Sequence, residues 1–313
     1  MTEPASRNDG AHSLLWPAVL LTVSALGWGI LYSLNRLATT DGIPFIPYVF
    51  WMGTGAALIL LGLGAAFRTL PRLSWEHMRG YLVLGTISFG MTYTVLAFVA
   101  PKVPAGVLGL GATLTPILTY PAAALFRMDR FRAIRTVGLI LGVAGVALVV
   151  VPETSLPTPD MAPWVLLSFA APVLYVANAL IISWLEPPPA GALPLAGGIL
   201  ATGALFMFVV MAATGQWWWF EGPMTDGDWA LAAAAGVTAL VFYLMIEIIR
   251  LAGPVFFTTV NFMIPLTGIG WGVLFFGESH SYWIWLALVL MLAGLFLVNR
   301  PSAPAGDASD PAS

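Results

Sequence analysis

A few polar and aromatic residues occur inside long apolar stretches of the chain, where they could bind a small molecule. Trp28, Tyr32 and Asn35 are spaced i, i+4 and i+7, so a helix would place them on one face. Tyr175 and Asn178 are spaced i, i+3 and share a face in the same way. We expect Trp28, Tyr32, Tyr175 and Asn178 to line a solute cavity by stacking and hydrogen bonding. The alternative is packing between helices, which we favour for Asn35 because it lies near the end of its stretch.

Two prolines interrupt apolar stretches in which hydroxyl or amide side chains lie nearby. Thr113 precedes Pro116 by three residues, and Asn261 precedes Pro265 by four and follows Thr258 by three. A proline within a helix leaves one backbone carbonyl without its donor, and neighbouring polar side chains can satisfy that carbonyl or expose it. Thr113 and Asn261 are therefore candidates for lining the same cavity. A locally stabilised packing kink is the alternative.

Tyr243 and Glu247 share a helical face at i, i+4, and Glu247 lies three residues before Arg250. A carboxyl group inside an apolar stretch could bind a cation or carry a coupling proton, since desolvation raises its pKa. The neighbouring arginine favours an ion pair near the end of the stretch instead. Tyr243 remains a candidate cavity residue, and so does Tyr93, which has two hydroxyl residues close by in sequence.

The composition indicates which kind of protein carries these residues. Of 313 residues, 59% are hydrophobic and 9% are charged, with a mean hydropathy of +0.90. Soluble domains have about 25% charged residues, so the chain is predicted to be an all-α membrane protein. A net charge of −3 gives no support for nucleic-acid binding.

The residue types exclude several kinds of chemistry. There are no cysteines, which removes disulfides, thiolate catalysis and iron–sulfur clusters. His12, His77 and His280 lie in separate polar segments, so no metal site is expected. The sequence contains neither a G-x-x-x-x-G-K-[ST] phosphate loop nor an H-E-x-x-H motif. We therefore expect no bound cofactor and no use of ATP by this chain.

The apolar stretches are long enough to cross a bilayer, which takes about 20 residues of helix. Charge and proline clusters divide the chain into ten predicted spans: 14–35, 44–66, 80–100, 105–126, 133–151, 163–184, 190–213, 228–250, 254–276 and 281–299. Residues 1–13 and 302–313 are predicted to be disordered tails, because they are rich in small and polar residues.

Basic residues predict the orientation, because they collect in cytoplasmic segments. With both termini in the cytoplasm, the outer segments contain only Arg36 and Lys102. The cytoplasmic segments then contain Arg7, Arg68, Arg72, Arg79, Arg127, Arg130, Arg132, Arg135, Arg250 and Arg300. We expect a multi-pass protein of the inner cell membrane with both termini in the cytoplasm.

The second half of the chain repeats features of the first. An offset of 149 aligns Pro116 with Pro265, Asp129 with Glu278, Gly145 with Gly294 and Pro152 with Pro301. An offset of 143 aligns Tyr32 and Asn35 with Tyr175 and Asn178. Because each copy has five spans, two copies, 14–152 and 163–301, would be inverted relative to each other, a recurrent plan in transporters. Chance similarity between glycine-rich helices is the alternative.

Three other features of the sequence indicate structural roles. Gly138-x-x-x-Gly142 predicts close helix packing, within one chain or between the subunits of a homodimer. The run Trp217-Trp218-Trp219 is typical of an interfacial aromatic belt. Asp129 and Glu278 are expected to cap or pair at turns without touching solute.

The chain resembles the EamA-like members of the drug/metabolite transporter superfamily over residues 14–301. The resemblance is carried by Gly27-Trp28-Gly29, by Pro116 followed by Asp129 and the glycines at 138, 142 and 145, and by Pro265 followed by Gly277-Glu278 and Gly294. It implies a ten-helix secondary carrier. Helices one to four of each repeat would surround a central cavity, and the fifth helix of each would be peripheral.

Together these features predict a transporter that exports or exchanges a small neutral or zwitterionic metabolite, such as an amino acid, by alternating access. The absence of lysine or arginine deep within a span argues against a polyanionic solute. A proton or a counter-solute could supply the coupling. A lipid or lipid-linked-sugar flippase of the same plan is the second hypothesis, and an integral-membrane enzyme is the least favoured.

Overall fold

The computed structural model describes residues 9–126, 132–186 and 188–300, and every regular element in these ranges is a helix. Eight helical segments are long and apolar enough to cross a membrane. Two further apolar helices, α12 (Val260–Phe276) and α13 (Tyr282–Val298), have 17 residues each. The chain is therefore a multi-pass membrane protein, as the composition predicts.

The eight longer segments contain one or several helices each. They are α1 (Asp9–Thr40); α2 (Phe45–Ala66); α3 (Trp75–Val83) with η1 (Leu84–Met91), α4 (Thr92–Val99) and η2 (Ala100–Lys102); α5 (Ala105–Leu110) with η3 (Gly111–Thr113) and α6 (Leu114–Leu125); α7 (Ala133–Val150); η4 (Pro159–Met161) with α8 (Ala162–Ser168) and α9 (Ala170–Leu185); α10 (Ala192–Thr214); and α11 (Asp226–Phe257).

Helix boundaries differ from the predicted spans at several places; the third span, for example, begins at Trp75 and not at residue 80. Helix α1 begins at Asp9, earlier than the predicted residue 14, because helical structure continues past the end of the apolar stretch. The predicted break between residues 250 and 254 coincides with Gly253, whose φ of 85° and ψ of 163° interrupt the helical conformation inside α11. A second interruption follows at Thr258 and Thr259, so α11 includes the start of the predicted ninth span.

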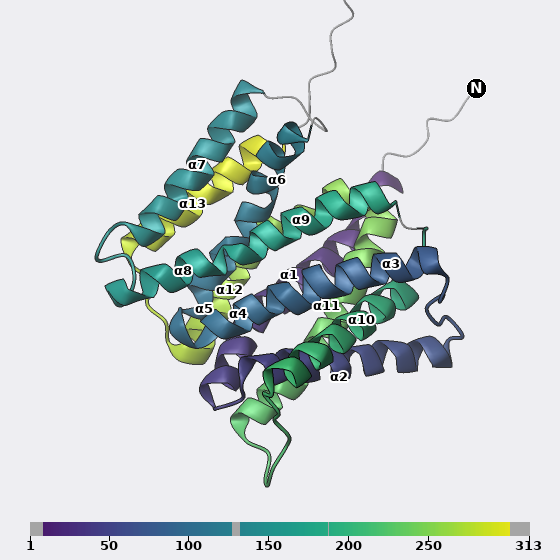
Figure 1. Ribbon diagram of the computed structural model, residues 1–313. Helices are drawn as coiled ribbons and strands as arrows, with labels where there is room; N and C mark the ends of the chain where they lie inside the picture. The colour runs from purple at the N-terminus through teal and green to yellow at the C-terminus, as the bar shows by residue number, and fades with distance from the viewer. Residues whose placement is uncertain (1–8, 127–131, 187, 301–313) are drawn as a thin grey trace, which may run out of the picture.

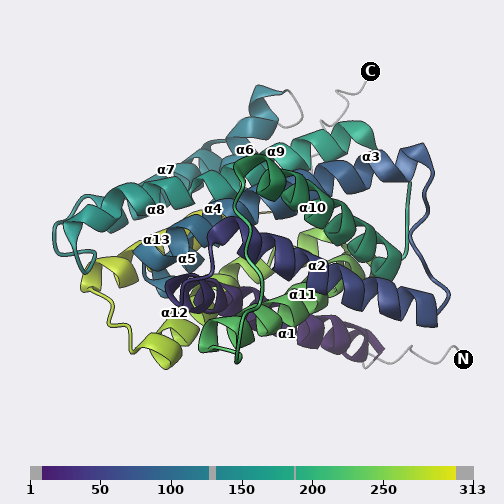
Figure 2. The ribbon, with the colours of Figure 1, turned by 60° about the horizontal axis from the view of Figure 1, so that its bottom comes forward.

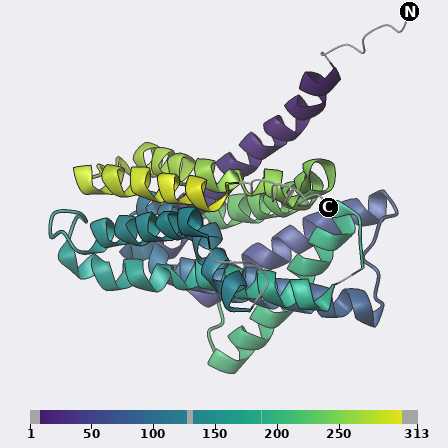
Figure 3. The same cartoon turned by 90° about the horizontal axis from the view of Figure 1, so that it is seen from above.

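Helices far apart in the sequence lie side by side. Helix α1 packs against α11 and α12, α2 against α10 and α11, and α5 against α12. Figure 1 shows α7 with α13 at one edge of the bundle and α2 with α10 at the opposite edge. Figure 2 shows α1 and α11 running together beside α2, and the first turns of α1 extend beyond the other helices in Figure 3.

The segment Leu84–Met91 is a π-helix of eight residues within the third span. The hydroxyl of Thr92 donates a hydrogen bond to the carbonyl of Ile87, five residues earlier, at 2.7 Å. Glycines bring this segment close to α10: a Cβ at Gly203 would lie 2.7 Å from the ring of Phe89. π-Helical turns are rare and occur mostly at functional sites.

The two peripheral helices α7 and α13 cross at glycines. A Cβ at Gly138 would lie 2.6 Å from the carbonyl oxygen of Gly294, and one at Gly294 would lie 2.9 Å from the backbone nitrogen of Gly142. The Gly138-x-x-x-Gly142 motif therefore packs helices within one chain, which confirms the first of its two predicted uses.

Candidate functional site

Four aromatic rings meet in the middle of the bundle. They come from Trp28 on α1, Phe89 on η1, Tyr93 on α4 and Phe242 on α11. The ring centroids of Phe89 and Tyr93 are 5.0 Å apart, those of Trp28 and Phe242 are 5.6 Å apart, and those of Trp28 and Tyr93 are 6.4 Å apart. We call these four residues the aromatic cluster. The spacing is that of mutually packed rings.

Three buried polar atoms, on α1, α4 and α9, have no hydrogen-bond partner among the described residues. They are the indole Nε1 of Trp28, the hydroxyl of Tyr93 and the amide Oδ1 of Asn178. Asn178 lies on α9, which packs against both α4 and η1. Buried polar groups are almost always paired, since leaving one unpaired costs about 1–3 kcal/mol. One donor, one acceptor and one hydroxyl that can do either are thus available to a bound molecule.

Tyr32 and Tyr175, two further predicted site residues, lie on α1 and α9, the helices that carry Trp28 and Asn178. Both are half-buried. Tyr32 packs against the same buried apolar cluster as Trp28, and Tyr175 lies one turn before Asn178 on α9. The buried hydroxyls of Ser24 and Ser33 on α1 also lack a described partner. Unpaired polar groups therefore extend along α1 from the aromatic cluster.

The two proline-associated candidates hydrogen-bond within their own segments. The hydroxyl of Thr113 donates to the carbonyl of Leu110 at 2.8 Å, and the side-chain amide of Asn261 donates to the carbonyl of Thr258 at 3.0 Å. Both bonds are what the packing alternative requires. Asn35 accepts from the hydroxyl of Tyr48 on α2 at 2.7 Å, as its expected packing role implies.

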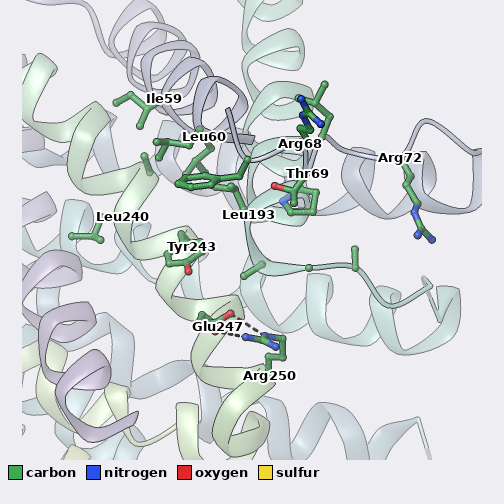
Figure 4. Close-up of a pocket in the computed structure, with 18 of the residues that line it drawn as sticks. Ile59, Leu60, Arg68, Thr69, Arg72, Leu193, Leu240, Tyr243, Glu247 and Arg250 are labelled. Carbon is green, nitrogen blue, oxygen red and sulfur yellow. Dashed lines mark hydrogen bonds and ion pairs between the residues drawn. The ribbon is translucent and has the colours of Figure 1, made fainter. Parts of the chain in front are cut away.

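A cavity of about 1130 Å³ opens at one end of the bundle, between α2, α10 and α11 (Figure 4). Of the predicted site residues, Tyr243 lines this cavity. Tyr243 also packs against the same two buried clusters of apolar side chains as Trp28. None of the four residues of the aromatic cluster lines this cavity.

Glu247 and Arg250 lie on the cavity wall one turn beyond Tyr243 (Figure 4). The guanidinium of Arg250 donates two hydrogen bonds to the carboxylate of Glu247, at 3.0 and 2.5 Å. The predicted ion pair is confirmed, and both oxygens of the one acid expected within a span are occupied by this arginine.

At the opposite end of the bundle, Glu278 joins three parts of the chain. Its carboxylate accepts hydrogen bonds from the guanidinium of Arg36 on α1 and from the backbone N–H groups of Ala105 and Gly106, at 2.7 and 3.0 Å. The N–H groups belong to the first turn of α5, where an anion is stabilised. We call this set of contacts the Glu278 clasp.

The expected capping and pairing role of Glu278 is thus confirmed, whereas Asp129 lies outside the described residues. The Nε2 atom of His280 is 3.5 Å from the carboxylate of Glu278. Burial lowers the pKa of His280, and the negative charge of Glu278 opposes this shift.

Phe89 and Phe242 are the members of the aromatic cluster that sequence reasoning missed. A phenylalanine within an apolar span has no polar group to distinguish it from ordinary packing. Arg68 and Arg72 on the cavity wall were also missed as site residues, because their position near the end of a span explains them as topology determinants.

Comparisons with known proteins bear on the family and the fold of the chain. Residues 15–151 match the model of the EamA-like transporter family. Protein PecM of Dickeya dadantii (strain 3937) is 22% identical to the chain over 281 residues, which cover 87% of this chain and 88% of PecM. A solved crystal structure with 18% identity superposes with a TM-score of 0.60 and covers 90% of this chain and 97% of that one. The last likeness shows the fold.

Proposed function

The chain is an EamA-like transporter of the drug/metabolite transporter superfamily, and on this premise we propose that it is a secondary carrier that exports or exchanges a small neutral or zwitterionic metabolite. The observation that carries the proposal is the set of three buried, unpaired polar atoms on Trp28, Tyr93 and Asn178. A solute between them would stack on aromatic faces and complete their hydrogen bonds.

The proposed architecture is two inverted five-helix repeats, residues 14–152 and 163–301. The packing partners support it. Helices at the same position in each repeat pack against each other: α2 with α10, α5 with α12 and α7 with α13. The first helix of one repeat packs against the third of the other in both directions, since α1 packs on α11 and α9 packs on α4. A pseudo-twofold axis in the membrane plane would produce this pattern.

The proposed orientation places both termini in the cytoplasm of a cell with an inner membrane. Arg68, Arg72 and Arg250 then lie at the cytoplasmic end, where basic residues collect. The cavity opens toward the cytoplasm and the Glu278 clasp closes the outer side. This arrangement corresponds to an inward-facing state of an alternating-access carrier.

The solute class follows from the charges. The aromatic cluster contains no acidic or basic residue, so a solute carrying several charges would be desolvated there without partners. A neutral molecule, or a zwitterion of the size of an amino acid, avoids this cost. A proton or a counter-solute is proposed as the coupling partner.

Reconstitution tests the proposal. Purified protein in proteoliposomes is given a panel of amino acids and related metabolites, with and without an imposed proton gradient. We expect saturable flux of a neutral or zwitterionic solute that a Trp28→Ala substitution reduces at least tenfold. Translocation of lipid in the absence of solute flux would favour a flippase and overturn the carrier.

A further inference from the structure

The cavity has an excess of positive charge at its mouth. Arg68, Arg72 and Arg250 are the basic residues that line it, and Glu247 is its acidic one. Glu247 is fully engaged by Arg250. Neither Arg68 nor Arg72 forms an ion pair with an acidic side chain in the part of the chain that the structure describes. Two guanidinium groups are therefore available to an anion.

The backbone at Arg68 is unusual for its residue type. Arg68 follows the end of α2 with a φ of 57°, in the left-handed region. The N–H of Thr69 reaches back to the carbonyl of Gly64 at 2.7 Å, and that of Arg68 reaches the carbonyl of Ala65 at 3.2 Å. This is the helix ending at which glycine is the usual residue, since other residues are strained there. Arg68 thus replaces the glycine that would fit this backbone without strain, and places a guanidinium on the cavity wall.

The rest of the cavity is largely apolar. Leu60 and Leu63 of α2, Leu193 of α10 and Leu240 of α11 line it. Figure 4 shows Arg68 beside Thr69 at the edge of this wall, and Arg72 farther from the leucines. Its volume of about 1130 Å³ is comparable with pockets that hold small organic ligands. One end therefore suits an apolar body, and the other suits an acidic group.

We propose that this cavity binds an amphipathic anion, with its acidic group at Arg68 and its apolar body against the leucines of α2, α10 and α11, while Arg72 adds to the positive charge at the mouth. The inference rests on the proposed function, since it treats the cavity as the cytoplasmic entrance of a carrier. The anion has two sources: a free carboxylate, including the carboxylate of an apolar zwitterion, or the headgroup of an anionic phospholipid. Guanidinium groups bind carboxylates and phosphates in the same bidentate manner.

The test is equilibrium binding to the full chain in nanodiscs of zwitterionic phosphatidylcholine. The probe is 3-phenylpropionate, and 2-phenylethylamine is its matched control with a similar aromatic body and the opposite charge. We expect the first to bind and the second to bind at least tenfold more weakly. Arg68→Gly and Arg72→Gln should each weaken binding of 3-phenylpropionate five- to tenfold. Arg135→Gln, on α7 and outside the cavity, should leave it unchanged.

Arg68→Gly separates binding from folding. Glycine removes the charge and relieves the left-handed backbone, so this variant should unfold at a higher temperature than wild type while binding the probe more weakly. Equal binding of the anionic and cationic probes, or unchanged binding in both arginine variants, would overturn the proposal.

A second arm identifies the source of the anion. Replacing part of the phosphatidylcholine by phosphatidylglycerol should reduce probe binding to wild type if the headgroup occupies the site, and leave it unchanged if the natural ligand is a free carboxylate. If binding depends on both arginines but no solute is transported in proteoliposomes, the carrier proposal is refuted and the anion-site proposal stands. If a solute is transported but the cavity shows no preference for anions, the anion-site proposal is refuted and the carrier proposal stands.

Discussion

The Glu278→Gln substitution tests whether the Glu278 clasp holds the outer side closed. The carboxylate side chain is 7% exposed, and Arg36 is 26% exposed. Glutamine keeps the shape, but its amide has one accepting oxygen instead of two and no charge. One of the two backbone N–H groups of α5 would therefore lose its acceptor, and Arg36 would lose its counter-ion.

The magnitude follows from these two losses. Hydrogen bonds to charged groups contribute about 1.5–3 kcal/mol each, and breaking a fully buried ion pair costs about 3–5 kcal/mol. Because Arg36 is partly exposed, the ion-pair loss is smaller than in a fully buried site, and we take the total as about 3 kcal/mol. At about 2–4 °C per kcal/mol, the unfolding midpoint should fall by roughly 6–12 °C.

If the clasp stabilises only the closed state, the same free energy shifts the equilibrium toward outward opening roughly a hundredfold. The chain has no cysteine, so one reporter can be introduced. Ser33 on α1 is 1% exposed and its hydroxyl is unpaired, which makes Ser33→Cys a small change. A membrane-impermeant maleimide added outside should label this cysteine much faster in the Glu278→Gln background.

The matched control is Glu153→Gln, which removes an exposed carboxylate from a loop on the same side. It should alter neither the midpoint nor the labelling rate. A lower midpoint with unchanged labelling in Glu278→Gln would mean that the clasp supports the fold without gating it. No change in either measurement would refute the reasoning altogether.

Three further predictions address the site, a loop and the peripheral helices. Tyr175→Phe and Asn178→Ala should each lower transport at least fivefold while protein abundance stays normal; unchanged flux would remove them from the site. The hydroxyl of Thr225 and a backbone N–H lower the pKa of Asp41, so its contribution to stability is present above about pH 4 and lost as the pH falls through the folded-state pKa. The difference in unfolding midpoint between wild type and Asp41→Asn should therefore be largest at neutral pH and vanish in acid, and a constant difference would contradict this. Gly138→Leu should destabilise the chain by about 3 kcal/mol, because its Cβ would collide with a carbonyl oxygen of α13; an unchanged thermal midpoint would show that the helices move apart freely.

Most of the fold could be predicted because membrane spans are a simple signal. Inside a bilayer, a stretch of about 20 apolar residues can form all its backbone hydrogen bonds only as a helix. Ten such stretches therefore predict ten apolar helices. The finer boundaries depend on tertiary contacts. Gly253 and Pro254 look like the end of a helix, and the chain does kink at Gly253, but helical residues resume until Phe257 and the chain is interrupted again at Thr258. The sequence marks only the first of these two places.

The candidate site was predicted only in part, for a similar reason. Trp28, Tyr93 and Asn178 could be selected because each has a polar atom that a bilayer would penalise. Phe89 and Phe242 complete the same cluster without such a signal. The role of Arg68 was hidden because its strained backbone and its place on the cavity wall exist only in three dimensions.

The wide π-helical turns of η1 accommodate an extra residue in the third span. An ordinary α-helix turns about 100° per residue, whereas the π-helix accommodates extra residues without lengthening the span in proportion. Deleting one residue between Leu84 and Met91 would let the segment tighten into regular α-helix. Because the wide turns already absorb that residue, the half of the span after them would keep about the same angle to α3, and the ring of Tyr93 would stay beside Trp28. Deleting a residue elsewhere in the span, where the turns are regular, would instead rotate the part that follows by about 100°.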